Sequence, residues 1–217
     1  MMKQGRLYGG LMAVAVILIV WTLWNRFVAD PGAAEFLAHK SGMGRAIRVP
    51  VWLTVLDVHI AAACTGLLAG AVNIATGAMK VRLRLHRLIG YVYVICVLAV
   101  VVTSGYMAPY ATGGRLVSML FNFWNLAWLA VTTTALIQIK RRRFDLHRRW
   151  MLRSYAFCFT NPSIHLLLTL LSAMFGLAYE TAYTGGLIGT MVLLPLAAEA
   201  VARSWRNNPA RPRKGGR

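Results

Sequence analysis

Six long, mostly apolar stretches constrain what this chain of 217 residues can fold into. A helix needs about 20 such residues to cross the hydrocarbon layer of a bilayer, and each stretch comes close to that length or exceeds it. The candidate spans are residues 7–24, 51–79, 88–110, 116–139, 150–179 and 185–201. They predict an all-α integral membrane protein with six transmembrane helices, organised as a single transmembrane domain over residues 1–217.

The cations lie between these stretches, except Arg153, which lies about one turn inside the fifth. Lys and Arg number 24 against 6 Asp and Glu. If the connections alternate between the two sides of a membrane, 19 cations fall on the side of the N-terminus and five on the other. This is the positive-inside pattern, which predicts a multi-pass protein of the bacterial inner membrane with both termini in the cytoplasm and a basic cytoplasmic tail over residues 203–217. The charge is explained by topology, so we expect no nucleic-acid partner.

Soluble-enzyme chemistry has no visible motif in the sequence. Cys64, Cys96 and Cys158 all lie in apolar spans, without the spacing of a zinc site or of a disulfide framework. The glycine-rich segments 111–114 and 184–186 are typical of short turns on the external side. Whether the chain is an enzyme is left open by the sequence, and an enzyme of this composition would be a membrane oxidoreductase or an electron-transfer component.

Two connections share a short repeat. The pattern R-[L/F]-x-L-H-R occurs at residues 82–87 and 143–148, and each copy leads into a span with an early tyrosine. The repeat suggests that the second and third spans form one helical hairpin and the fourth and fifth a related one. We therefore expect a core four-helix bundle of spans two to five, with spans one and six outside it.

These elements resemble a known family. The element LHRxxGYxY at 85–93, Ser104-Gly105, and the element LHRRWMxRSY at 146–155 are similar to bacterial multi-pass membrane proteins grouped as domain of unknown function 2306. The resemblance covers roughly residues 50 to 180. It implies an integral membrane protein and no particular activity, so the functional argument depends on the side chains.

Two histidines lie deep in the spans, where a polar side chain needs a partner or a task. His59 of the second span and His165 of the fifth are expected at similar depth in the outer half of the bundle. Two neutral imidazoles that face each other across a bundle are the axial ligands of a b-type haem. We take this outer pair as the better candidate for a cofactor site, with haem b as the cofactor and haem iron as the metal.

His86 and His147 match in depth at the cytoplasmic edge and form a candidate second pair. His147 and His165 are 18 residues apart, which is five turns and places them on one face of a straight helix, about 27 Å apart. Pro162 can change that phase by kinking the helix. The architecture is similar to transmembrane di-haem b cytochromes, which usually distribute their ligands over four helices. The fourth span here has no histidine, which weighs against a second haem.

Structural roles compete with each of these assignments. His86 and His147 also suit the lipid headgroup interface. His59 also suits a bond to a carbonyl or hydroxyl of a neighbouring helix, and His165 a bond to backbone freed by Pro162. Among the charged residues, the sequence predicts that the Arg153 side chain extends to the cytoplasmic surface. It also predicts an ion pair between Glu199 and Arg203, because Arg203 follows Glu199 by four residues on a helix.

Two classes of function remain open on this basis. The first is a b-type haem protein that transfers electrons, with a quinone or a redox protein as its partner besides the lipid bilayer. The second is a non-redox transporter or an assembly factor with a polar cavity in the membrane. The polar set in that case is Asp57, His59, Asn73, Asn161 and His165.

Overall fold

The computed structural model describes residues 2–38, 47–79 and 83–206, and these ranges contain helices and no strand. The long helices are α1 (Met2–Trp24), α3 (Val49–Met79), α4 (Leu83–Met107), α5 (Gly114–Lys140) and α8 (Tyr179–Arg206). The remaining span consists of α6 (Phe144–Ala156), a 3₁₀ turn η3 (Phe157–Phe159) and α7 (Thr160–Phe175). Six segments are long and apolar enough to cross a membrane, which confirms the predicted all-α class.

Short elements complete the chain on the side away from the termini. A π-helical turn, η1 (Asn25–Ala29), ends the first span, α2 (Ala34–Ala38) follows it, and η2 (Ala108–Tyr110) ends the third. The remainder of the loop after α2 and the basic tail from residue 207 onward lie outside the described residues.

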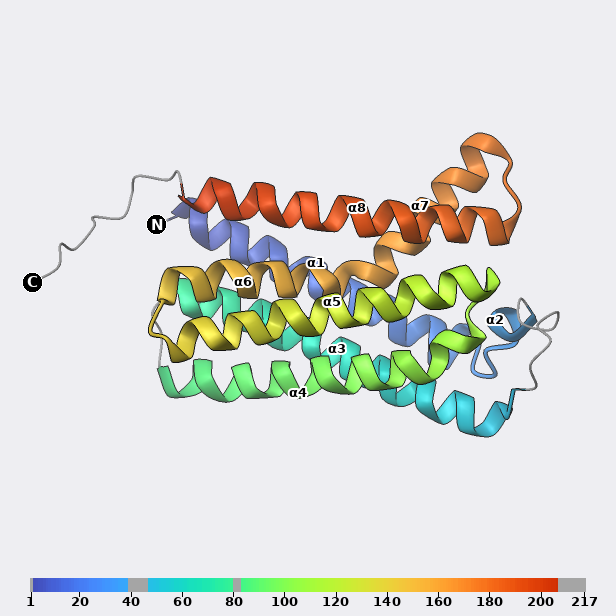
Figure 1. The fold of residues 1–217 in the computed structure, drawn as a ribbon, viewed down its shortest axis with the longest axis horizontal. Coiled ribbons are helices and arrows are strands. Elements are labelled where there is room, and N and C mark those ends of the chain that lie inside the picture. The colour runs from blue at the N-terminus through green and yellow to red at the C-terminus, as the bar shows by residue number, and fades with distance from the viewer. Residues whose placement is uncertain (1, 39–46, 80–82, 207–217) are drawn as a thin grey trace, which may run out of the picture.

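Four helices form a closed ring. α3 contacts α4, α4 contacts α5, α5 contacts α6, and α6 contacts α3. α1 packs against α3, and α8 covers α6 and α7 (Figure 1). The predicted core bundle with two flanking helices is therefore confirmed, and α4 and α6 occupy diagonal positions in the ring.

Both described termini lie at the same end of the bundle (Figure 1). We call this the basic end, because α4 and α6 begin there and α5 ends there, with Arg84, Arg87, Arg141, Arg142, Arg143, Arg148 and Arg149. The opposite end is called the distal end. A shallow hollow of about 330 Å³ lies over the α5–α6 turn and is lined by residues 142–146.

His86 and His147, with the arginine that follows each, lie in helices and not in connections, contrary to the prediction. α4 begins at Leu83 and α6 at Phe144, several residues before the apolar runs begin. Hydropathy marks the part of a helix that meets lipid, whereas the hydrogen-bonded helix continues into the headgroup region, where arginine is a good helix former.

The fifth span is broken near its middle, which overturns the straight-helix estimate. η3 interrupts it at Phe157–Phe159, and α7 then leaves the bundle on the side of α8 (Figure 1). Pro162 explains the position of the break, because a proline ring clashes with the carbonyl four residues earlier, here that of Cys158. The change of direction removes the five-turn register between His147 and His165.

The turn before the last span lies earlier than predicted. α7 ends at Phe175 and is capped by Gly176. This glycine has a φ of 61°, and its N–H donates to the Ser172 carbonyl. The predicted turn at 184–186 is instead inside α8. A Cβ at Gly186 would lie 2.9 Å from the Ile164 carbonyl oxygen, so this glycine allows α8 to approach the α7 backbone closely. The turn predicted at 111–114 is confirmed, with Gly113 at a φ of 94° before α5.

Candidate functional site

His86 and His147 occupy equivalent positions on diagonal helices at the basic end. Each is the fourth residue of its helix, α4 or α6. The next equivalent pair along these helices is Tyr93 and Ser154, the eleventh residues, and they meet across the bundle with 2.8 Å between the two hydroxyl oxygens. The two imidazoles lie near enough for their charges to interact. The structure therefore places this pair at one level of the bundle, at the basic end of two helices that touch further along.

The hydrogen bonding of His147 assigns its proton. Its Nδ1 lies 2.9 Å from the Ala135 carbonyl oxygen of α5. A carbonyl only accepts, so Nδ1 carries the hydrogen and Nε2 keeps a lone pair. Metal-bound histidines in proteins use this arrangement, in which a carbonyl on one ring nitrogen fixes the tautomer and orientation of the ring.

Gln138 contributes a buried polar atom without a partner. Its Oε1 is inaccessible to solvent and forms no hydrogen bond within the part of the chain that the structure describes, whereas the His86 imidazole, whose Nδ1 is also inaccessible, interacts with the Asn73 backbone. Nearly all buried polar atoms in proteins are paired, and an unpaired one costs about 1–3 kcal/mol. Gln138 lies on α5 one turn beyond Ala135, whose carbonyl binds His147, so the basic end holds a polar atom that the described side chains do not use.

Asn73 holds the α4 backbone beside His86. With its amide oriented for bonding, the nitrogen donates to the His86 carbonyl oxygen at 3.1 Å and the oxygen accepts from the Gly90 N–H at 2.9 Å. Gly90 allows this approach, since a Cβ there would lie 3.3 Å from the amide. The buried Asn73, which the sequence marked only as a polar residue near a helix end, positions the histidine-bearing turn.

A fully bonded hydroxyl layer lies deeper in the bundle, around Ser154. Its side chain is completely buried, donates to Thr132 Oγ1 at 2.7 Å and accepts from the Tyr93 hydroxyl. The Trp128 indole N–H is a further donor to it at 3.3 Å, and Thr132 donates onward to the Trp128 carbonyl. A serine offers one donor and two acceptor sites, so this layer leaves nothing for a ligand.

His59 belongs to a second bonded set in the distal half. The Thr103 hydroxyl donates to the Ala99 carbonyl at 2.7 Å, so the 2.9 Å contact with His59 Nδ1 is a bond in which the imidazole donates. This confirms the predicted bond to a hydroxyl of a neighbouring helix. Next to Thr103, Ser104 accepts from the Asn125 amide at 2.8 Å.

The same set continues across α5 to the break in the fifth span. The Trp124 indole N–H donates to Thr160 Oγ1 at 2.9 Å, and Thr160 donates to the Phe157 carbonyl. We call the six residues of this set the polar belt: His59, Thr103, Ser104, Trp124, Asn125 and Thr160. It joins α3, α4, α5 and α7 through bonds within the protein.

His165 does not face His59 in the structure. His59 points at α4, whereas His165 is exposed on α7, which packs against α8 on the other side of the molecule (Figure 1). The break at η3 carries His165 away from the core ring. The outer pair therefore gains no support from the geometry.

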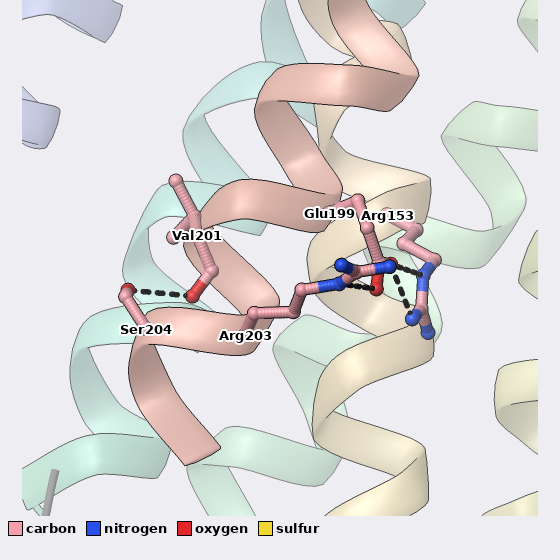
Figure 2. Close-up of polar contacts among 5 residues, drawn as sticks. All are labelled: Arg153, Glu199, Val201, Arg203 and Ser204. Atoms are coloured by element: carbon pink, nitrogen blue, oxygen red, sulfur yellow. Dashed lines mark hydrogen bonds and ion pairs between the residues drawn. The ribbon is translucent and has the colours of Figure 1, made fainter. Parts of the chain in front are cut away.

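Glu199 ties α8 to the bundle through two arginines (Figure 2). Its carboxylate lies 2.8 Å from Arg203 on the same helix, as predicted, and 2.7 Å from Arg153 of α6. The Arg153 guanidinium also lies over the Trp150 ring, 4.9 Å from its centre. Arg153 therefore pairs between helices instead of extending alone to the surface, because a carboxylate is available at its own depth.

Arg26 and Asp57 form an ion pair that the sequence did not predict. The guanidinium lies 2.8 Å from the carboxylate and also donates to the Pro31 carbonyl, which joins η1 to α3 at the distal end. The sequence places the pair 31 residues apart, and only the depth of both residues near a span end could have suggested it.

The donor set at the basic end restricts which metal chemistry fits. Over the described residues, no three His, Cys, Asp or Glu side chains lie close enough to hold a bare metal ion. A b-type haem would need only two imidazoles from the protein, because the macrocycle supplies the other four nitrogens. His86 and His147 would be enough for a haem, whereas a metal bound by protein alone would need further ligands.

Comparison with known proteins gives one match. The family model described as "Predicted membrane protein (DUF2306)" matches residues 56–201, a range that holds both histidine pairs, the polar belt and the Ser154 layer. No curated protein and no solved structure matches the chain.

Proposed function

The chain belongs to the DUF2306 family of predicted membrane proteins, and we propose that it is a membrane electron-transfer protein with one b-type haem at its basic end. His86 and His147 would hold the haem iron. The single observation that supports the proposal is the equivalent position of these two imidazoles, each the fourth residue of one of two diagonal helices, within range for their charges to interact.

Neighbouring residues would orient each of the two histidines. The Ala135 carbonyl fixes the tautomer of His147 and leaves Nε2 free to bind iron. Asn73 fixes the turn of α4 that carries His86. A haem ligated by two imidazoles exchanges single electrons, and the bundle sets its potential by excluding water. With the basic end on the cytoplasmic side, as the positive-inside rule favours, the electron donor is a cytoplasmic protein or a quinol.

The test is the absorption spectrum of the detergent-purified protein, oxidised and reduced with dithionite, from cells supplied with a haem precursor. We expect a sharp reduced b-type band that falls to background in His86→Ala and in His147→Ala. His59→Ala and His165→Ala serve as matched controls and keep the band, because neither residue contributes to the basic-end site.

Two results would contradict the proposal. One is a colourless preparation with iron at background, from a protein that circular dichroism shows to be helical. The other is a band that survives both basic-end substitutions and is lost in His59→Ala or His165→Ala, which would return the site to the outer pair.

A second function, transport, is favoured by the broken fifth span. Discontinuous helices in transporters bring backbone groups to a substrate within the membrane, and η3 interrupts the fifth span beside the polar belt. If the break lines a solute route, Asp57→Asn changes uptake or export of that solute in cells and leaves the absorption spectrum unchanged. The haem proposal is preferred because the polar belt is bonded within the protein.

A further inference from the structure

α7 carries two polar side chains on its exposed side. Asn161 and His165 are four residues apart, so they lie one above the other on one face of the helix. Both are exposed, and neither side chain forms a hydrogen bond with another described residue. We call these two residues the polar face of α7.

The rest of α7 shows which way this face points. Ile164 is buried against Leu187, and Leu167 and Leu171 lie against glycines of α8. A helix advances about 100° per residue, so the polar face is turned about a quarter of the circumference away from α8. It therefore lies outside the packed α7–α8 contact.

This exposure is costly in a membrane. His165 lies about 15 Å along the helix axis from the end of α7, in the distal half of the span. Two other polar side chains of the spans are bonded: His59 to Thr103, and the exposed Asn122 to the Ser118 carbonyl of its own helix. A lipid-facing polar group without a partner is rare and points to a contact with another polypeptide.

We propose that the polar face of α7 is the contact between two copies of this chain. In a membrane, two copies have the same orientation and depth, so a two-fold axis along the membrane normal brings each residue opposite its own copy. An asparagine amide and a neutral imidazole each contain a donor and an acceptor, so each is able to bond to its twin. Hydrogen bonds between helices of this kind stabilise membrane dimers.

Cysteine cross-linking tests the contact while the polar face stays intact. Ser172 lies two turns beyond His165 on the same face, and Met174, which is 71% exposed, lies on the opposite side of α7. In a background with Cys64, Cys96 and Cys158 replaced by alanine, Ser172→Cys is expected to form a disulfide-linked dimer in native membranes under mild oxidation. Met174→Cys is the matched control and stays monomeric.

The hydrogen bonds are tested in the same Ser172→Cys background. Adding Asn161→Leu and His165→Leu is expected to weaken dimerisation roughly 5- to 30-fold, measured by dilution of labelled protein into lipid vesicles. Asn122→Leu is the control and leaves dimerisation unchanged, because that amide already bonds to its own helix.

The outcome is decided by dimerisation, independently of any cofactor. A helical protein that stays monomeric in lipid, or one in which Met174→Cys cross-links and Ser172→Cys does not, overturns the proposal. Undiminished dimerisation in the Asn161→Leu, His165→Leu variant, with its helical content intact, also overturns it.

Discussion

The two ends of the four-helix bundle differ in how they treat buried polar groups. In the distal half, each contact of the polar belt ends on a partner within the protein, as His59 does on Thr103. The Ser154 layer in the middle is bonded in the same way. At the basic end, Gln138 Oε1 is buried without a partner among the described residues, on the helix whose Ala135 carbonyl orients His147 through Nδ1.

This difference separates polar groups that hold the fold together from polar groups available to a ligand. A bonded network stabilises and orients the helices that it joins, and it has little capacity left to bind anything else. An unbonded buried group lowers stability, and it persists where a bound molecule compensates. Substitutions at the two ends should therefore act in opposite directions on the stability of the cofactor-free protein.

The largest effect on stability is expected from Ser154→Ala. The Tyr93 hydroxyl and the Trp128 indole N–H would both lose their acceptor in a fully buried site. We expect a loss of about 2–4 kcal/mol in the free energy of unfolding, measured by denaturant unfolding in detergent micelles. Ser163→Ala on α7 is the control. A similar loss in both variants would show that the hydrogen bonds of the Ser154 layer do not stabilise the fold.

A smaller loss is expected from Asn125→Leu in the polar belt. The substitution removes the donor to Ser104 that links α5 to α4. Hydrogen bonds between membrane helices are worth about 0.6–1.7 kcal/mol, and the free energy of unfolding should fall by that amount in the same assay. Asn122→Leu, one turn away on the lipid-facing side, should be neutral; if the two variants behave alike, the belt does not hold the helices together.

The smallest effect is expected from Gln138→Leu at the basic end. This change removes an unpaired buried oxygen, so the cofactor-free protein should keep its stability within about 0.5 kcal/mol or become more stable. A loss of more than about 1.5 kcal/mol in the unfolding assay would mean that Gln138 is bonded in the folded protein. The contrast between the two ends would then disappear.

The fold could be predicted from the sequence because a bilayer demands long apolar runs, and such runs are visible without any knowledge of packing. The positions of the turns between helices were predicted less accurately. Gly185 and Gly186 predict a turn when only local preference is considered, but they lie inside α8, where the missing side chains let α7 approach. The choice between these two uses of glycine depends on the neighbouring helix.

The candidate site could be predicted only in part, for a related reason. The repeat identified His86 and His147 as a matched pair, but we ranked them below the outer pair because the fourth span has no histidine and because His59 and His165 were expected at similar depth. Pro162 indicated that the fifth span would be broken, but the direction in which α7 leaves the bundle depends on its packing against α8. Asn73 and Gln138 were single polar residues in apolar runs, and rotational phase decides what such residues contact.

The equivalence of α4 and α6 bears on how such a bundle can arise. Both hairpins of the ring run in the same sense, and their eleventh residues, Tyr93 and Ser154, touch each other as the same residue does in a symmetric dimer. A half-length ancestor pairing with its twin would have had this core before the two halves were fused. In that ancestor a single mutation to histidine would have placed two imidazoles at equivalent positions at once.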